Sequence, residues 1–207
     1  MMLLVSLGSS RNLAAVPAGF TPLFNGRNLD GWRGGETHDP RLLAAMSPAE
    51  REAQIAKWNA SLIEVKDGHP HWRVEGGELI NDGKGGYATT EKDYGDFELL
   101  VDWKITAGTD SGVYLRGVPQ VQIWDPASPD PKGFGNAKGS GGLWNNDKKS
   151  PGRDPLVKAD NAVGTWNTFR VVMVGSRVSV WLNGKPVVNH AILENYYDQK
   201  LPVEKRR

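Results

Sequence analysis

The sequence has no cysteine, no long apolar run and almost no net charge, and each absence excludes a class of function. Without cysteine, disulfides and thiolate zinc sites cannot form, although an oxidising compartment remains compatible with the sequence. No segment stays apolar over the roughly 20 residues that a membrane-spanning helix needs. A formal net charge of +1 gives no electrostatic case for binding nucleic acid or an anionic membrane.

The remaining composition favours one large β domain. The 207 residues are 39% hydrophobic, which is enough for a core, and all-β sandwiches of this size often form a single domain. With 25 glycines and 13 prolines, many turns and few long helices are expected. Eight tryptophans suit either a sandwich core or a surface that stacks against sugars.

The N-terminal segment has only part of the pattern of a secretory signal. Its apolar run, Met1 to Val5, is short, and Arg11 follows the run instead of preceding it. We interpret residues 1–16 as a residual or clipped leader outside the fold, and residues 17–207 as the folded domain.

One helix is predicted, over Ser47 to Ala60. Ser47 suits the N-cap, Pro48 the first helical position, and Glu50 completes a capping box. Its apolar stripe is weak, so we expect a surface excursion inserted in the β frame.

From residue 71 onward the chain predicts strands with alternating faces. The predicted strands are His71–Val74, Glu78–Asn81, Asp96–Ile105, Ser111–Arg116, Gln120–Trp124, Trp166–Val174, Arg177–Leu182 and Pro186–Val188. Asn183-Gly184 is the strongest hairpin turn signal in the chain.

Three of these strands, 96–105, 111–116 and 120–124, have apolar side chains on one face and polar or aromatic side chains on the other. If they are adjacent, one surface carries Glu98, Asp102, Lys104, Tyr114, Arg116, Gln120, Gln122 and Trp124. Such a surface suits sugars, because hydroxyls bond to charged and amide groups while the C–H face of the ring stacks on an aromatic side chain. The alternative is a solvated sheet face, with Asp102 and Lys104 in an ordinary cross-strand ion pair instead of an acid–base cluster with Glu98.

A long irregular segment, Pro126 to Asp160, contains the run GSGGLWNN over Gly139 to Asn146. Its glycines could let the backbone approach a ligand, or the segment could be a plain flexible loop. No cofactor is predicted. A structural or catalytic divalent metal remains an alternative, with His69 and His71, or the acidic stretch Asp125 to Asp130, as its candidate ligands.

Several motifs together resemble the 3-keto-disaccharide hydrolase family. They are FTPLFNGRNLDGW (20–32), WRVEGGELINDG (72–83), DYGDFELLVDWKI (93–105), DSGVYLRG (110–117), VQIWD (121–125), GSGGLWNN (139–146) and GTWNTFRVVMVGSRVSVWLNGKPVV (164–188). The resemblance implies a concanavalin A-like antiparallel β-sandwich, or jelly roll, and activity on glycosides oxidised to a ketone at sugar carbon 3. It implies proton removal next to the ketone, elimination of the glycosidic oxygen and hydration.

Carried onto this sequence, the resemblance makes Asp102 the leading base, with Lys104 and Arg116 as stabilisers of the enolate. Gln122 and Asp125 become substrate-positioning residues. The candidate pocket walls are Tyr114, Trp124, Trp144 and Asn145, and Glu98 and Gln120 complete the expected sugar-binding surface.

Two departures from the family's pattern stand out. Gln120 occupies a position where the family often has glutamate, and after Pro202 we expect further strands that the sequence does not contain. The resemblance implies a periplasmic or secreted enzyme whose partner is an oxidised sugar or glycoside. A non-catalytic sugar-binding module is the alternative, and the oligomeric state is not determined by the sequence.

Overall fold

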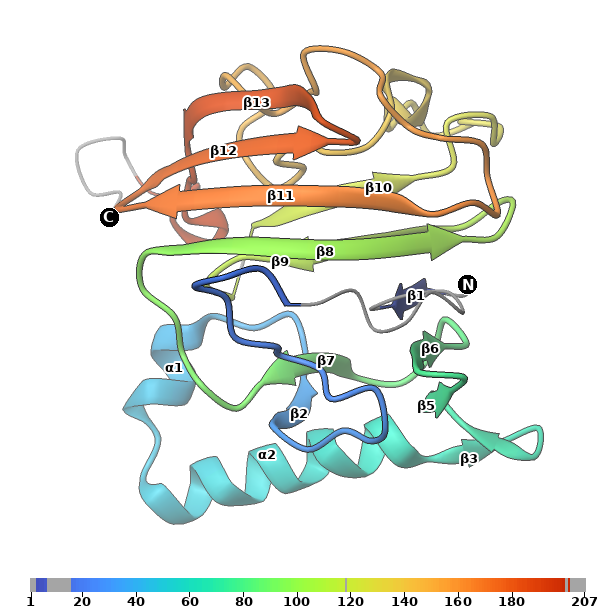
Figure 1. Cartoon of the computed structure of the whole chain (residues 1–207). Coiled ribbons are helices and arrows are strands. Elements are labelled where there is room, and N and C mark those ends of the chain that lie inside the picture. The colour runs from blue at the N-terminus through green and yellow to red at the C-terminus, as the bar shows by residue number, and fades with distance from the viewer. Residues whose placement is uncertain (1–2, 7–15, 118, 200, 202–207) are drawn as a thin grey trace. The chain divides into compact units, whose positions relative to one another are not determined.

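The computed structural model describes residues 3–6, 16–117, 119–199 and 201 (Figure 1). The chain divides into two compact units, Met1–Asp93 and Tyr94–Arg207, and each is described by itself. None of the described helices combines the length and apolar character that crossing a bilayer requires.

The first unit combines short antiparallel strands with two helices. The strands are β1 (Leu3–Ser6), β2 (Trp32–Gly35), β3 (Val65–Lys66), β4 (His69–Pro70), β5 (Trp72–Glu75), β6 (Glu78–Asn81) and β7 (Tyr87–Thr90), and the helices are α1 (Pro40–Ala45) and α2 (Pro48–Ile63). Strand β6 pairs with β5 on one side and β1 on the other, β2 pairs with β7, and β3 pairs with β4.

Strand β1 lies within residues 1–16, and the interpretation of that segment as a leader stays a prediction. Leu3–Ser6 pairs antiparallel with β6, with Leu3 opposite Asn81 and Ser6 opposite Glu78. The physical reason is that the β5–β6 hairpin leaves an open edge, which a short apolar segment can complete. The rest of that segment, residues 1–2 and 7–15, lies outside the described residues.

Helix α2 begins as the sequence predicts. The Glu50 backbone N–H donates to the Ser47 hydroxyl (3.4 Å), and the Glu50 carboxylate accepts from the Ser47 backbone N–H (2.9 Å), so the capping box is present. Helix α1 was not predicted, and the Asp39 side chain caps it by accepting from the Arg41 N–H.

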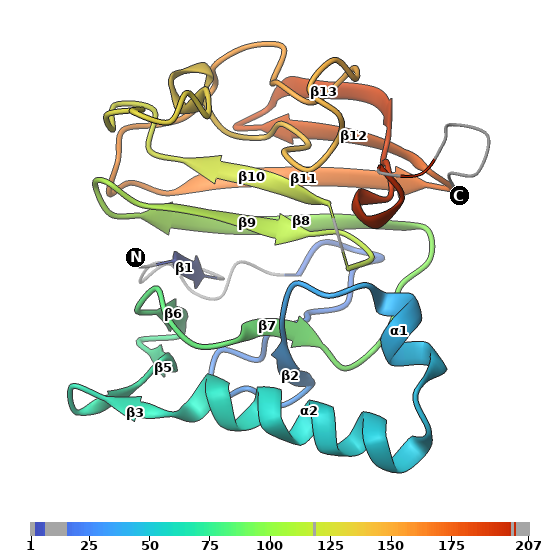
Figure 2. The same ribbon diagram turned by 180° about the vertical axis from the view of Figure 1, so that it is seen from behind.

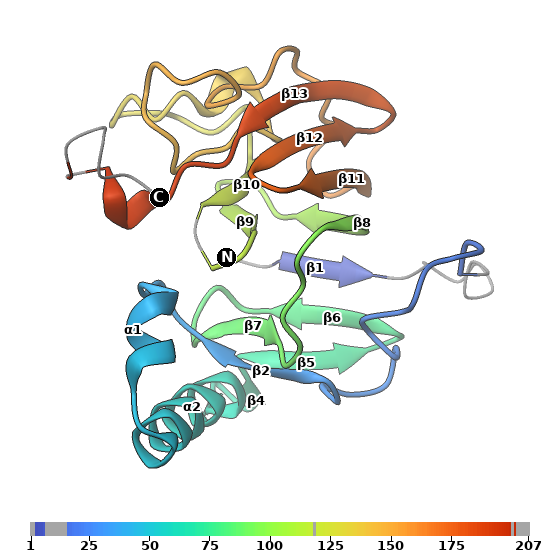
Figure 3. The same ribbon diagram turned by 90° about the vertical axis from the view of Figure 1, so that its left-hand side faces the viewer.

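Helix α2 lies at the surface with most of its residues exposed, as its weak apolar stripe predicts, but part of it is packed against a strand. Trp58 and Leu62 are buried, and the helix packs on β2 (Figure 3). The contact is close because Gly34 of β2 has no side chain: a Cβ there would lie 2.1 Å from the Trp58 carbonyl carbon. The Gly34 N–H also donates to the Asn59 side chain (2.7 Å), which fixes the helix against the strand.

The second unit contains the longer strands. They are β8 (Phe97–Ile105), β9 (Asp110–Tyr114), β10 (Gln120–Trp124), β11 (Asn167–Val174), β12 (Arg177–Leu182) and β13 (Lys185–Ile192), with short 3₁₀ turns at Asn136–Lys138 and Tyr196–Asp198. Strands β8, β11, β12 and β13 form an antiparallel sheet in the order β13-β12-β11-β8, and β9 pairs with β10. Asn183 and Gly184 both have positive φ (51° and 80°), which confirms the predicted hairpin turn between β12 and β13.

The core of this unit lies between two layers, which Figures 2 and 3 show side by side. Phe169 and Val187 of the four-stranded sheet lie against Gly141, and residues 141–143 continue the β10 layer through hydrogen bonds with Gln122 and a bridge between Val121 and Leu143. The fully buried side chains include Trp103, Leu115, Val121, Ile123, Leu143, Phe169, Val171, Met173, Val178, Val180 and Leu182. The predicted all-β antiparallel sandwich is therefore confirmed.

Candidate functional site

The predicted acid–base residues of β8 lie on the face turned away from the core, because they alternate with buried Trp103 and Ile105. Each has a partner from β11 or just before it. Glu98 accepts from Arg170 Nε (2.6 Å), Asp102 accepts from the Thr168 hydroxyl (2.5 Å), and Lys104 Nζ lies 4.7 Å from the centre of the Trp166 ring. These contacts are cross-strand pairs of the kind that stabilise a sheet.

The face of β10 turned away from the core carries the predicted sugar-binding amides. Gln120, Gln122 and Trp124 alternate with Val121 and Ile123, which are fully buried against the other layer. Gln122 is itself buried: its amide N–H donates to the Ser111 carbonyl (2.9 Å), and its oxygen accepts from Gln120 Nε2 (2.7 Å). Tyr114 lies opposite Gln120 in the register.

Strand β8 is not a neighbour of β9 or β10, so the condition for one shared surface is not met. Strand β8 pairs with β11 and not with β9, and the turn at residues 106–109 carries the chain into the other layer. The outer face of the β8 layer therefore carries Glu98, Asp102 and Lys104. The outer face of the other layer carries Gln120, Gln122 and Trp124.

The structure also places Arg116 and Asp125 in local structural roles. The Arg116 guanidinium donates to the carbonyls of Gly95 (2.6 Å) and Gly175 (2.8 Å), and so links the segment before β8 to the turn between β11 and β12. Asp125 is buried, and its carboxylate accepts from the backbone N–H groups of Gly108 and Ala127 (both 2.8 Å). Each donor or acceptor used in this way is less available to a substrate.

An aromatic wall lies at the end of β10 and is made by Trp124, Phe134 and Trp144. The Trp144 ring meets Trp124 edge-on at 5.1 Å and Phe134 at 5.6 Å, while Trp124 and Phe134 are nearly parallel at 6.2 Å. The Arg153 guanidinium carbon lies 3.6 Å from the centre of the Trp144 ring. Asn145 instead holds the strand, because its side-chain oxygen accepts from the Gln120 N–H (3.1 Å).

The glycines near this wall approach protein atoms. Gly142 lies so close to the Arg153 carbonyl that a Cβ would be 2.6 Å from its oxygen, and Gly141 lies against Val187. Among the described side chains, the hollow lined by Gln122, Trp124, Trp144 and Arg153 has a volume of about 10 Å³, room for about one water. A sugar would therefore bind across the aromatic wall, outside this hollow.

Asp110, which the sequence did not single out, lies on the same face of the ribbon. It pairs with Trp124 in the β9–β10 register. Asp110 is exposed to solvent, yet desolvation by neighbouring protein raises the pKa of its carboxyl above the usual 3.8, and a hydrogen bond with Gln122 opposes this rise. A carboxylate with a raised pKa beside amides and aromatic rings has the properties of a general base.

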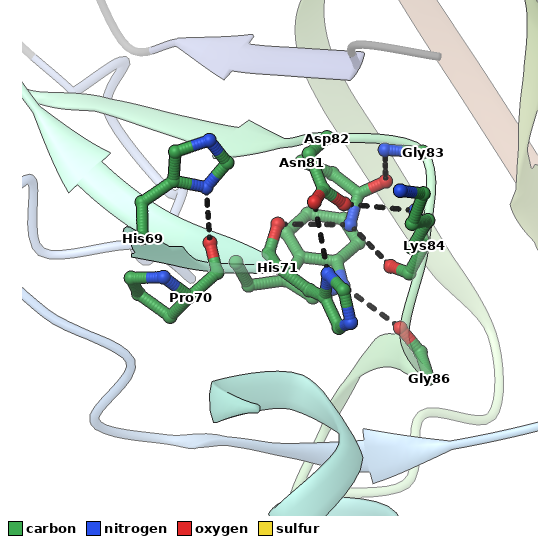
Figure 4. Close-up of polar contacts among 9 residues, drawn as sticks. His69, Pro70, His71, Asn81, Asp82, Gly83, Lys84 and Gly86 are labelled. Atoms are coloured by element: carbon green, nitrogen blue, oxygen red, sulfur yellow. Dashed lines mark hydrogen bonds and ion pairs between the residues drawn. The ribbon is translucent and has the colours of Figure 1, made fainter. Parts of the chain in front are cut away.

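The two candidate metal positions are used in other ways. Figure 4 shows His71 Nδ1 hydrogen-bonded to the Asp82 carboxylate (2.9 Å), while His69 Nδ1 contacts the Pro70 carbonyl (3.4 Å). Asp130 accepts from the N–H groups of Phe134 and Gly135, which lowers the pKa of its carboxyl. In the described ranges, no three His, Asp or Glu side chains gather as metal ligands would.

The His71–Asp82 pair predicts a pH-dependent contribution to stability. Burial raises the pKa of Asp82, but hydrogen bonds with His71 and with the Lys84 N–H outweigh it, so the net pKa lies below 3.8. The stabilisation is therefore complete above the unfolded pKa and is lost as pH falls through the lower folded pKa. Asp82→Asn should lower the urea midpoint at pH 7, and the difference from wild type should shrink as the pH falls below 3.8. Asp67→Asn, at an exposed turn, is the control. Equal midpoints for Asp82→Asn and wild type at pH 7 would contradict this role.

Comparison with known proteins agrees with the fold and with the motifs. The chain is 28% identical over 97 residues to a 3-keto-disaccharide hydrolase of Bacteroides thetaiotaomicron; the match covers 46% of this chain and 27% of that relative, so the chain spans about a quarter of its length. A solved structure of a candidate glycosyl hydrolase from Parabacteroides distasonis superimposes with a TM-score of 0.52 at 24% identity, covering 87% of this chain and 75% of that one. The model of the 3-keto-alpha-glucoside-1,2-lyase-like domain matches residues 19–206. The chain therefore belongs to the 3-keto-alpha-glucoside-1,2-lyase-like domain family.

Proposed function

We propose that the β9–β10 face and its aromatic wall bind a glycoside carrying a ketone at sugar carbon 3, and that the protein cleaves its glycosidic bond. The observation that carries this proposal is the pairing of Asp110 with Trp124 next to the buried amide of Gln122. Desolvation by neighbouring protein raises the pKa of this carboxyl although the residue is exposed, and the carboxyl lies beside rings on which a sugar can stack, whereas the Asp102 carboxylate is held in a cross-strand pair with Thr168.

The reaction follows from the acidity that the ketone confers on carbon 2. Asp110 removes the proton from carbon 2, and the C–H electron pair forms a double bond to carbon 3 while the carbonyl oxygen takes the negative charge. The enolate then restores the ketone, forms a double bond between carbons 1 and 2, and expels the glycosidic oxygen, which takes up a proton. Water adds to carbon 1 and a proton returns to carbon 2, so the net change is hydrolysis.

The other residues of the face have positioning roles in this proposal. Gln122 holds Asp110 through their hydrogen bond and is itself held by Gln120. Trp124 and Trp144 offer rings for the C–H face of the sugar. Asp102 is a weaker candidate than it was from sequence, because its carboxylate accepts from Thr168 on the outside of the other layer.

The proposal is tested by incubating the purified protein with a 3-keto-disaccharide and, separately, with the unoxidised parent disaccharide. The second sugar should be released from the keto compound alone, because only the ketone acidifies carbon 2. If a folded sample bound the keto compound without releasing the second sugar, this face would be a sugar-binding module and not an active site.

A further inference from the structure

Arg153 lies at the aromatic wall with one of its hydrogen-bond donors unused. Its guanidinium covers the Trp144 ring at 3.6 Å and lines the small hollow beside Gln122. Arg153 Nε is buried and has no hydrogen-bond partner among the described residues. An unpaired buried donor on a cation is unusual, since buried polar groups nearly always find a partner, so this atom calls for an explanation.

The charge of Arg153 is also incompletely balanced. Burial lowers the pKa of the guanidinium, and the neighbouring Asp154 opposes that effect. However, the Asp154 carboxylate accepts a hydrogen bond from Lys138 Nζ at 2.5 Å, so its charge is shared with a second cation. Arg153 is thus a partly desolvated cation, and the carboxylate that opposes its desolvation is already paired with Lys138.

Other arginines of the same unit differ in this respect. Arg116 donates to the carbonyls of Gly95 and Gly175, and Arg170 donates to Glu98 while lying 4.5 Å over the Trp181 ring. Arg153 shares the stacking on tryptophan with Arg170 but lacks its carboxylate partner. Burial closes Arg153 Nε itself to a substrate, but the residue as a whole is half-buried, so an oxyanion outside the hollow would meet the terminal NH₂ groups of the guanidinium.

We propose that Arg153 is a catalytic residue that stabilises the enolate oxygen at carbon 3 of the substrate. The inference rests on the proposed function. When the proton leaves carbon 2, the carbonyl electron pair moves onto the carbon 3 oxygen, and the guanidinium faces that new negative charge. Trp144 fixes the guanidinium plane, so the cation is oriented before the charge develops.

The test compares Arg153→Ala with Arg170→Ala, a matched control that removes another arginine stacked on tryptophan. In Arg153→Ala, kcat should fall by about 10²–10³-fold with little change in KM, because the interaction forms mainly in the transition state. Arg170→Ala should keep a kcat within a few-fold of wild type. Added guanidinium should restore part of the activity of Arg153→Ala and none in the control.

Each outcome has a separate meaning. If wild type cleaves the keto compound and folded Arg153→Ala keeps its kcat, the role of Arg153 is overturned while the proposed function stands. A loss in Arg153→Ala that guanidinium does not rescue, accompanied by a lower melting temperature, would also overturn it in favour of a structural role. Inactive wild type would overturn the proposed function and this inference together.

Discussion

Asp110→Asn is expected to retain the fold and to lose about 10²–10⁴-fold in kcat/KM on a 3-keto-disaccharide, the usual contribution of a general base. Asparagine preserves the size of the side chain and its position opposite Trp124 but cannot accept the carbon 2 proton. The change should not destabilise the protein at neutral pH. The folded state raises the pKa of Asp110, so it favours the protonated carboxyl, and any stability from this group is lost as pH rises through the folded pKa.

Asp102→Asn is the comparison that decides between the two carboxylates. It removes the same charge from the outside of the other layer, where the carboxylate bonds to Thr168. We expect it to keep a kcat/KM within a few-fold of wild type. The kcat/KM of wild type should rise with pH through a midpoint above 3.8, in line with the raised pKa of Asp110. Full activity in Asp110→Asn together with a large loss in Asp102→Asn would show that the base is Asp102 on β8.

Gly34→Ala should destabilise the first unit by about 3 kcal/mol, the upper end of the usual cost of overpacking. The added Cβ would lie 2.1 Å from the carbonyl carbon and 2.2 Å from the carbonyl oxygen of Trp58. Both are backbone atoms of α2, so the clash can be relieved only by moving the helix away from β2. The measurement is urea unfolding, with hydrogen exchange of the α2 amides to show where the stability is lost.

Gly95→Ala is the matched control. A Cβ at Gly95 meets no described atom within 4 Å, and the residue does not have a left-handed φ. This variant should lie within about 0.5 kcal/mol of wild type, as surface substitutions usually do. If Gly34→Ala proved as stable as Gly95→Ala, the close approach of α2 to β2 would be incorrect.

Alternation and turn chemistry predicted much of the fold. Residues 120–124 and 177–182 form strands over the predicted bounds, because an aliphatic side chain recurs at every second position and turn residues flank them. The packing of α2 on β2 could not be predicted, since it depends on a glycine 24 residues earlier in the chain, Gly34 against Trp58. Periodicity describes one segment at a time and does not identify its packing partner.

The candidate site was only partly predictable for the same reason. The shared face of Gln120, Gln122 and Trp124 follows from alternation alone. Which strand lies beside β8 does not, and its pairing with β11 separates Asp102 from that face. Asp110 was missed because the predicted strand began one residue later, and Arg153 lies in an irregular segment where no period indicates orientation.

The most direct test of the central claim is the cleavage reaction run in D₂O, with NMR analysis of the released 3-keto sugar. Proton removal and return at carbon 2 predict deuterium at that carbon in the product formed by wild type, above the level in an enzyme-free sample. Cleavage of the keto compound with carbon 2 still fully protonated, or equal cleavage of the unoxidised parent, would contradict the elimination and hydration route.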